Sequence, residues 1–491
     1  MIEIEASIHD PFSLEIKVGF KTDKVGEKRE FDINTWMFIP NSFDINAATY
    51  LKQQFYSDVK SKVRFITPAF HLREIVDNGA IPLNNLRASM NLLNKTSDNL
   101  IENSMEYEFQ LKMFMAIFRS SIRDSVSEIK SKKYTSELSD LCLEYVKNLQ
   151  GIIDSFREVK KSIKGFEDDS DVMNYYSFGN EFLSYSSVNY TFQLIDAIKD
   201  VKERLLPSTY QELVNLIIKE EEYRKTVGFL DVLIDDRENN QKVIYRYDML
   251  NKYVESDLVL VSNKRKDEDG VIAQQIYYSI AAGVSMIFAT MIAFSFQQKY
   301  GNFTMPLFVA LVISYMLKDR IKELMRFYFA GKLGGKYFDN NTVISVKDQK
   351  IGWMKEASDF ITEDKVPEEV LNLRDRSALL EVENRIHNEK IMLYRKRVCL
   401  ENSKVLQEST YAFDGIHDIL RFNITRLTQR MNNPYVALYT LKKDGELDEI
   451  LADKVYYLNI ISQIKYEDKV EYKRFRLVCQ RTGILRIEAL L

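Results

Sequence analysis

Residues 276–296 read IYYSIAAGVSMIFATMIAFSF, an uncharged and mostly apolar run in the middle of a chain of 491 residues. Charged residues make up 29% of the whole chain, so an uncharged run of this length stands apart from its surroundings. A helix rises about 1.5 Å per residue, and about 20 apolar residues therefore cross the roughly 30 Å hydrocarbon core of a bilayer. We expect a transmembrane helix over about 275–297.

A second uncharged run follows almost at once, from Tyr300 to Leu317. Pro306 lies near its start, where the first turn of a helix has no internal acceptor for the N–H that proline lacks. Gly301 and Asn302, between the two runs, are typical turn residues. The sequence therefore predicts a second transmembrane helix over about 301–318, antiparallel to the first. The alternative is an apolar hairpin buried inside a large soluble domain.

Basic residues cluster at the two outer ends of this hairpin, whereas the connecting loop contains only Lys299. By the positive-inside bias, we expect a multi-pass membrane protein with both termini cytoplasmic. The second helix should continue as an amphipathic segment, so that the membrane domain covers 270–330; this segment suits either the anionic inner leaflet or docking on the protein's own domains. The basic flank comprises Lys264, Arg265, Lys266, Lys318, Arg320, Lys322 and Arg326.

Small side chains recur at every fourth position along parts of both runs, which aligns them on one face of each helix. Helices in lipid gain little from the hydrophobic effect, so close approach along small residues is a main source of packing energy. These faces pack the hairpin on itself, or they also hold an oligomer such as a pore. The residues are Ala281, Ser285, Ala289 and Ala293 in the first run, and Ala310 and Ser314 in the second.

The overall composition excludes some classes of function. The net charge is −4 and no basic domain is present, so we expect no nucleic-acid partner. The N-terminus contains acidic residues and no apolar segment, and no cleavable signal peptide is expected. The three cysteines, Cys142, Cys399 and Cys479, are far apart, which fits a reducing cytosol.

The part of the chain before the hairpin divides into two regions. Residues 1–45 alternate apolar and polar side chains and are expected to form a small N-terminal β unit. From 46 to 265, apolar residues recur at helical spacing and glycine and proline are rare, which predicts a cytosolic bundle of long helices with some coiled coil. Such a module usually binds protein or connects domains.

From 336 to 491 we expect a second cytosolic domain of the α+β class, rich in antiparallel strands. Helices are predicted from Pro367 to about Lys390 and from Asp418 to Met431. The whole chain is thus predicted to be an α+β multi-domain membrane protein: a long-helix bundle, a two-helix transmembrane hairpin and a C-terminal antiparallel α+β domain. Strands are predicted at 392–400, 435–441, 455–464, 472–479 and 484–487.

The sequence predicts no catalytic, cofactor-binding or metal-ligating residues, and no cofactor is expected. Residues 330–336, AGKLGGK, superficially match a phosphate loop, but Ala330 replaces its first glycine and Tyr337 its Ser or Thr, so a linker is the better interpretation. The histidines have no metal-binding spacing. The least improbable catalytic cluster is His417 with Asp414, Asp418, Arg421 and Asn423. The other histidines are His9, His71 and His387.

Three hypotheses about function follow. The preferred one is a membrane-anchored scaffold, adaptor or sensor, whose partners are the lipid bilayer and either other proteins or further copies of itself. The second is an oligomeric effector that perturbs the membrane or forms a pore. The third is an enzyme with an unfamiliar site in a cytosolic domain; the missing catalytic set makes this the least favoured.

Overall fold

The structure is a computed structural model that describes most of the chain, in two compact units. Unit 1 comprises Met1–Arg64, Leu260–Thr410 and Gly415–Leu491, and unit 2 comprises Phe65–Val259 and Tyr411–Asp414. The described residues are 2–21, 29–75, 80–95, 99–163, 170–266, 268–302, 304–333, 337–346, 349–386, 388–400, 411, 413, 415–466 and 469–490.

Unit 1 contains two large sheets, and every neighbouring strand pair with a described register is antiparallel. The four-stranded sheet has the order β1 (Ile2–Asp10), β2 (Ser13–Lys21), β9 (Gly415–Asn423), β4 (Val59–Phe65). The eight-stranded sheet has the order β14 (Gly483–Ala489), β13 (Lys469–Gln480), β12 (Tyr456–Tyr466), β3 (Arg29–Ile39), β8 (Lys390–Leu400), β7 (Gln349–Ile361), β6 (Asn340–Val346), β5 (Val261–Lys266).

The N-terminal strands form where they were expected but do not make a β unit of their own. β3 lies between β12 and β8 in the eight-stranded sheet, and β2 pairs with β9 in the other sheet. Trp36, for example, is opposite Ile461 on one side and Leu393 on the other. The three N-terminal strands are thus part of the same two sheets as the C-terminal region.

Both faces of the eight-stranded sheet are covered near β3. Met37 and Ile39 pack into a core that also contains residues of β2, β9 and β12, so the two sheets share this core. The alternate residues, Trp36 and Phe38, pack on the other side with Val370 of α10 (Glu368–Arg374). Successive side chains of a strand point to opposite faces, which explains why 36–39 is apolar at every position.

Two helix predictions for the C-terminal region were wrong. Residues Gly415–Asn423 form β9, and only the single turn α13 (Thr425–Thr428) is helical within the segment predicted from Asp418 to Met431. In β9 the even-numbered residues from Ile416 to Phe422 are buried and the odd-numbered ones are more exposed. This period of two is typical of a strand, but Ile419 and Phe422 also match helical spacing.

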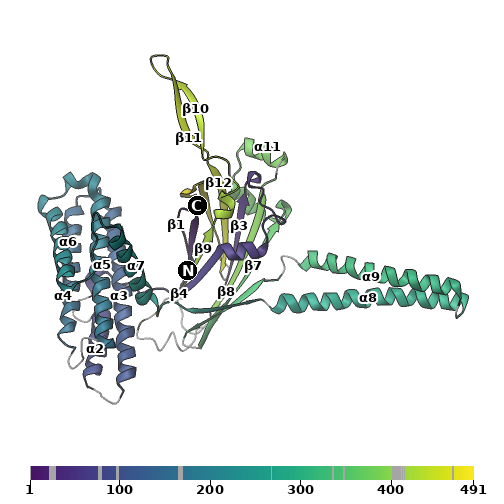
Figure 1. The fold of residues 1–491 in the computed structure, drawn as a ribbon, viewed down its shortest axis with the longest axis horizontal. Coiled ribbons are helices and arrows are strands. Elements are labelled where there is room, and N and C mark those ends of the chain that lie inside the picture. Colours follow the sequence, from purple (N-terminus) through teal and green to yellow (C-terminus); the bar gives the residue numbers. More distant parts are fainter. Residues whose placement is uncertain are drawn as a thin grey trace. The chain divides into compact units, whose positions relative to one another are not determined.

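The helix predicted from Pro367 to Lys390 is interrupted. It divides into α10 and α11 (Ala378–Ile386), with Asp375 between them in a left-handed conformation at a φ of 48°. The strands predicted from 392 onward are confirmed. β10 (Tyr435–Leu441) pairs with β11 (Leu447–Asp453), which was not predicted, in a two-stranded ribbon (Figure 1).

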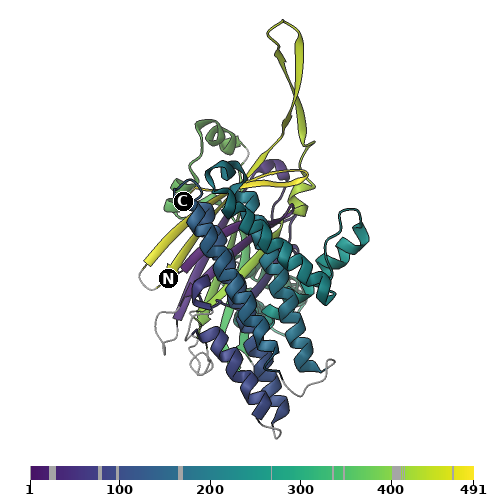
Figure 2. The same ribbon diagram turned by 90° about the vertical axis from the view of Figure 1, so that its left-hand side faces the viewer.

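Unit 2 is a bundle of long helices that run side by side, as predicted (Figures 1 and 2). Stacked aromatic rings in its interior join three of them: Phe114 lies 5.7 Å from Phe156, which lies 5.3 Å from Tyr176 between ring centroids. The helices are α2 (Ile81–Lys95), α3 (Leu100–Ser131), α4 (Leu138–Lys160), α5 (Asp171–Ile198), α6 (Pro207–Val227) and α7 (Arg237–Glu255).

The remaining helices include the hairpin of α8 (Glu268–Tyr300) and α9 (Met305–Leu333). This hairpin is inserted between β5 and β6, which are neighbouring strands, and Lys266 is paired with Asn340 at its base. Both ends of the hairpin therefore join one edge of one sheet. The short helices are α1 (Lys52–Asp58), η1 (Asn41–Phe43), η2 (Leu72–Ile75), η3 (Lys199–Arg204) and η4 (Glu363–Lys365).

Candidate functional site: the α8–α9 hairpin

One helix of the described chain is long and apolar enough to cross a membrane. It is the segment Gln274–Tyr300 of α8, of which 11% is buried. A core helix of a soluble protein would be mostly buried, so the exposure of this segment favours a lipid environment. By length and composition α8 is thus a candidate membrane span.

The second predicted span, 301–318, does not meet the same condition. α9 starts at Met305 and continues without a break through Lys318, Asp319 and Arg320 to Leu333, so its uncharged part is short for a bilayer. The structure therefore supports one candidate span, and it does not support two spans or a multi-pass topology.

Small residues lie where the two helices meet. Ala281, Ser285, Ala310 and Ser314 are between 0% and 7% exposed, and Ala289 and Ala293 are half-buried. The Ser314 hydroxyl donates a hydrogen bond to the Ala289 carbonyl across the hairpin, at 3.1 Å. The larger apolar side chains point outward instead; Ile287, Met291, Phe294, Phe308 and Met316 are each more than 60% exposed.

Three contacts define the register of the hairpin. Besides the bond from Ser314 to Ala289, the Arg326 guanidinium lies 4.9 Å from the Tyr278 ring centroid. The rings of Tyr277 and Phe329 are 5.0 Å apart between centroids. Because α8 and α9 are antiparallel, a step of one residue toward the C-terminus of α9 corresponds to a step of one residue toward the N-terminus of α8. Lys318 therefore lies at about the level of Met286, well inside the apolar run of α8.

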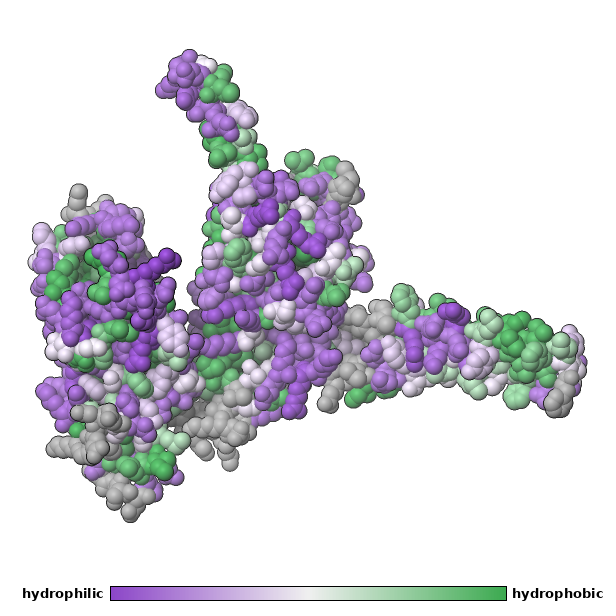
Figure 3. Space-filling view, in the orientation of Figure 1, coloured by the Kyte–Doolittle hydropathy of each residue, from purple (hydrophilic) through white to green (hydrophobic). Residues whose placement is uncertain are grey.

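The charged residues of α9 face outward at this level. Arg320 and Glu323 form an ion pair at 3.0 Å, with side chains 78% and 67% exposed. The Lys318 ammonium lies 3.7 Å from the Tyr315 ring centroid. Figure 3 shows apolar residues on the distal part of the hairpin and a band of hydrophilic residues next to them, on the side of the base.

The basic residues before α8 lie in β5. Lys264 forms an ion pair with the buried carboxylate of Glu356, at 2.7 Å, so part of its charge is used within unit 1. Arg265 and Lys266 are exposed and pair through their backbones with Asn341 and Asn340. Lys264 is exposed as well, although its ammonium is paired with Glu356, so all three basic residues before α8 reach the surface of this strand.

Glu356 belongs to a buried polar cluster between the two sheets. Lys396 on β8 is 3% exposed, donates to the carboxylate of Asp418 on β9 and lies 3.7 Å from Glu356. The Ser61 hydroxyl donates to Asp418 at 2.7 Å, and the Tyr394 hydroxyl donates to Glu356 at 2.8 Å. Burial alone would raise the pKa of Glu356, but the ammonium groups of Lys396 and Lys264 outweigh it and lower this pKa.

This cluster has the features of a structural element. Its carboxylates each accept from at least two donors, and buried charges persist when they are paired and hydrogen-bonded in this way. Lys396 and Asp418 also line a cavity of about 40 Å³ that is otherwise mostly apolar. That volume accommodates about one water molecule and no larger ligand.

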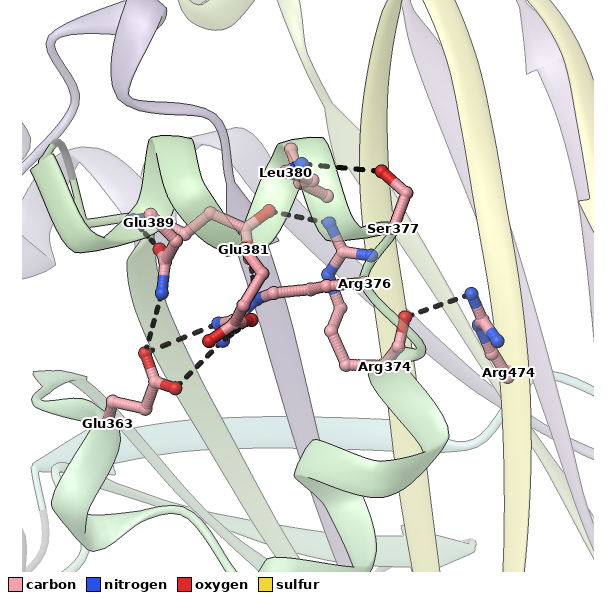
Figure 4. Close-up of polar contacts among 9 residues, drawn as sticks. Glu363, Arg374, Arg376, Ser377, Leu380, Glu381, Glu389 and Arg474 are labelled. Atoms are coloured by element: carbon pink, nitrogen blue, oxygen red, sulfur yellow. Dashed lines mark hydrogen bonds and ion pairs between the residues drawn. The ribbon is translucent and has the colours of Figure 1, made fainter.

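A second charged cluster joins α10, α11 and the start of η4 (Figure 4). Arg374 donates to Glu389 at 2.7 Å, and Arg376 bridges Glu389 and Glu363 at 3.1 and 2.8 Å. The hydrogen bonds from Arg376 lower the pKa of Glu363. Arg474 of β13 donates to the Arg374 carbonyl at 3.0 Å. The pairing of arginines with carboxylates fixes the path of the chain around the left-handed Asp375.

The histidine cluster considered from the sequence does not assemble. His417 and Asp418 are adjacent in β9, so they face opposite sides of the sheet, and Asp418 is bonded to Lys396. Arg421 pairs with Glu15 at 2.7 Å, and Asn423 accepts from the Thr425 backbone N–H. Asp414 and His387 lie outside the described residues, as does 334–336 of the glycine-rich segment.

Unit 2 contains an open groove of about 300 Å³ beside η2. It is lined by residues that include His71 and Arg73, Asp124 and Glu128 of α3, and Glu144 of α4. The hydrogen bond from Lys132 lowers the pKa of Glu128. In the part of the chain that the structure describes, no group of three or more His, Cys, Asp or Glu side chains is placed to hold a metal ion.

Comparison with known proteins gives no relative: the chain matches no family model, no curated protein and no solved structure. Its function must therefore be argued from its own residues.

Proposed function

We propose that this chain is a membrane-anchored interaction protein, in which the α8–α9 hairpin enters a lipid bilayer and holds units 1 and 2 at the membrane surface as a scaffold, adaptor or sensor. The observation that supports it best is the arrangement of the hairpin. Small residues are buried between its helices, while bulky apolar side chains point outward on the distal part. Water is a poor solvent for such a surface and lipid is a good one.

The hairpin also favours a particular sidedness. Its two ends join neighbouring strands of one sheet, so both leave the bilayer on the same side. The basic residues at these ends favour the cytoplasmic side. We therefore propose that the two sheets of unit 1 and all of unit 2 are cytoplasmic, whether or not the hairpin crosses the whole bilayer.

Exposed apolar residues in both units support a role in protein binding. On the β10–β11 ribbon, Leu438, Tyr439, Leu441 and Leu447 are each more than half exposed. A two-stranded ribbon is marginal by itself in water, so one with an apolar surface is suited to a partner. In unit 2, the segment before α7 exposes Val232, Leu233 and Ile234.

The other two hypotheses have less support. An oligomeric pore held by the small-residue faces would need those faces to be free, but Ala281, Ser285, Ala310 and Ser314 are already buried. An enzyme would need a polar pocket, and among the described residues the cavity between the sheets holds about one water. Open grooves among the described residues of unit 2 remain for such a site, such as the one beside η2 and one of about 340 Å³ lined in part by Arg87, Glu158 and Lys161.

Membrane fractionation of the full-length protein tests the proposal. We expect the wild type to remain in the membrane pellet after alkaline carbonate extraction. Replacement of two exposed apolar residues, Phe294→Lys together with Phe308→Lys, should move most of the protein to the soluble fraction, because lysines that face lipid within a membrane segment are costly. The matched control is Ile234→Lys in unit 2, at a side chain that is 99% exposed.

The control variant should stay in the pellet. The proposal fails if the wild type is extracted by carbonate, or if the lysine pair in the hairpin fractionates like the control.

A further inference from the structure

We propose that only the distal half of the hairpin, Ile287–Phe296 of α8 together with Met305–Leu317 of α9, is embedded in hydrocarbon, and that its base stands in the headgroup region and water. This inference rests on the proposed membrane insertion. It concerns how deeply the hairpin is inserted. The apolar run of α8, taken alone, would predict that α8 is embedded over all of 276–296.

The first argument is the register of the hairpin. Ser314 lies against Ala289, and Arg326 against Tyr278, so Lys318 is level with about Met286 and Arg320 with about Val284. If α8 were embedded over its whole apolar run, Lys318 would lie about 15 Å below the surface, near the bilayer midplane. The chain between Lys318 and Arg326 would then be inside the hydrocarbon too.

The second argument is the exposure of these charges. Arg320 and Glu323 are 78% and 67% exposed on the hairpin surface, so they would face lipid and not the partner helix. Charged side chains within a membrane are normally turned toward a protein interior or a water-filled cavity. The described hairpin offers them neither, which places this level of the hairpin outside the hydrocarbon.

The third argument is the length of the part that is apolar on both helices. Met305–Leu317 of α9 is about 20 Å long and Ile287–Phe296 of α8 is about 15 Å long. This apolar part ends at polar residues at the tip of the hairpin, where Gln297 donates a hydrogen bond to Asn302 at 2.7 Å. At the base of the hairpin it ends at Lys318. The embedded belt is therefore short, and suits a thin or locally thinned bilayer.

The base of the hairpin is amphipathic, as the headgroup region requires. Ile280 and Val284 of α8 and Leu324 and Phe327 of α9 are exposed, beside the basic residues of α9. Apolar side chains at this level sit at the boundary of the acyl chains, while Lys and Arg reach the lipid phosphates. The basic residues are Lys318, Arg320, Lys322 and Arg326.

The depth of the hairpin in the bilayer can be measured by the accessibility of single cysteines to a water-soluble reagent. Val284→Cys and Met291→Cys are introduced separately into the full-length protein, at exposed positions above and below the proposed boundary. Open membrane fragments, which expose both faces, are treated with a membrane-impermeant maleimide. The native cysteines Cys142, Cys399 and Cys479 are buried, so they contribute little background.

We expect the residue-284 thiol to be labelled at least tenfold faster than the residue-291 thiol in membranes, and both to be labelled fully in detergent. A second pair, Ile280→Cys and Phe294→Cys, repeats the comparison if one variant folds poorly. Equal protection of both thiols in membranes, with full labelling in detergent, would overturn the inference and leave the membrane anchor intact. Rapid labelling at both positions in membranes would overturn the inference and the proposed insertion together.

Discussion

At the scale of single residues, Lys396 is the side chain whose role is clearest. It is 3% exposed and balances the buried carboxylates of Asp418 and Glu356. This cluster could not be predicted from the sequence, because its members lie on β4, β5, β7, β8 and β9 and meet only when the two sheets pack together. The sequence did place Asp418 beside His417, but a strand sends neighbouring side chains to opposite faces.

Replacement of Lys396 by methionine, which keeps the length of the side chain and removes its charge, should destabilise unit 1. The variant leaves two carboxylates close together without their shared cation, and breaking a buried ion pair in this way costs about 3–5 kcal/mol. The chain has two tryptophans, Trp36 and Trp353, and both lie in unit 1. Urea unfolding in mild detergent, followed by tryptophan fluorescence, therefore reports on this unit.

Lys365→Met is the matched control, because Lys365 is an exposed lysine of the same unit. It should change the free energy of unfolding by less than about 0.5 kcal/mol. A Lys396→Met protein as stable as this control would contradict the assigned role of the buried cluster.

At the scale of helices and strands, local patterns predicted most elements but not how strands pair. The apolar runs predicted α8 and the start of α9, and strand patterns predicted β1, β2, β3, β8, β10, β12, β13 and β14. The charged half of α9 was predicted as an amphipathic continuation of the second helix, and the sequence could not show that it packs beside α8. β9 was mistaken for a helix because its apolar residues fit both periods.

The packing of the hairpin on itself can be tested with a pair of cysteines. Ala289→Cys with Ser314→Cys should form an intramolecular disulfide when membranes are treated with a mild oxidant, since the Ser314 hydroxyl is 3.1 Å from the Ala289 carbonyl. Loss of both free thiols, with monomeric migration on a non-reducing gel, is the expected result. The control pair, Ile287→Cys with Ile313→Cys, lies on exposed faces and should keep its thiols.

A disulfide-linked dimer of the Ala289→Cys, Ser314→Cys variant would contradict packing of the hairpin on itself. It would mean that the small-residue faces meet between copies of the chain, as the oligomeric hypothesis requires.

At the scale of the whole molecule, unit 1 is built around two insertions. Unit 2 is inserted between β4 and β5, and the connecting segments run side by side, with the Leu260 N–H bonded to the Val63 carbonyl at 3.0 Å. The hairpin is inserted between β5 and β6. The sequence suggested consecutive blocks, 1–45, 46–265, 270–330 and 336–491, because hydrophobic periodicity is local and contains no information on pairing between strands about 400 residues apart.

The central claim is that the distal hairpin contacts the hydrocarbon of a bilayer. The most direct measurement is photolabelling of the full-length protein in native membranes with a carbene-forming reagent that partitions into lipid, followed by mapping of the labelled peptides by mass spectrometry. The account predicts label concentrated in Ile287–Phe296 and Met305–Leu317, with little in the rest of unit 1 or in unit 2. A hairpin that takes up no more label than the helices of unit 2 would contradict it.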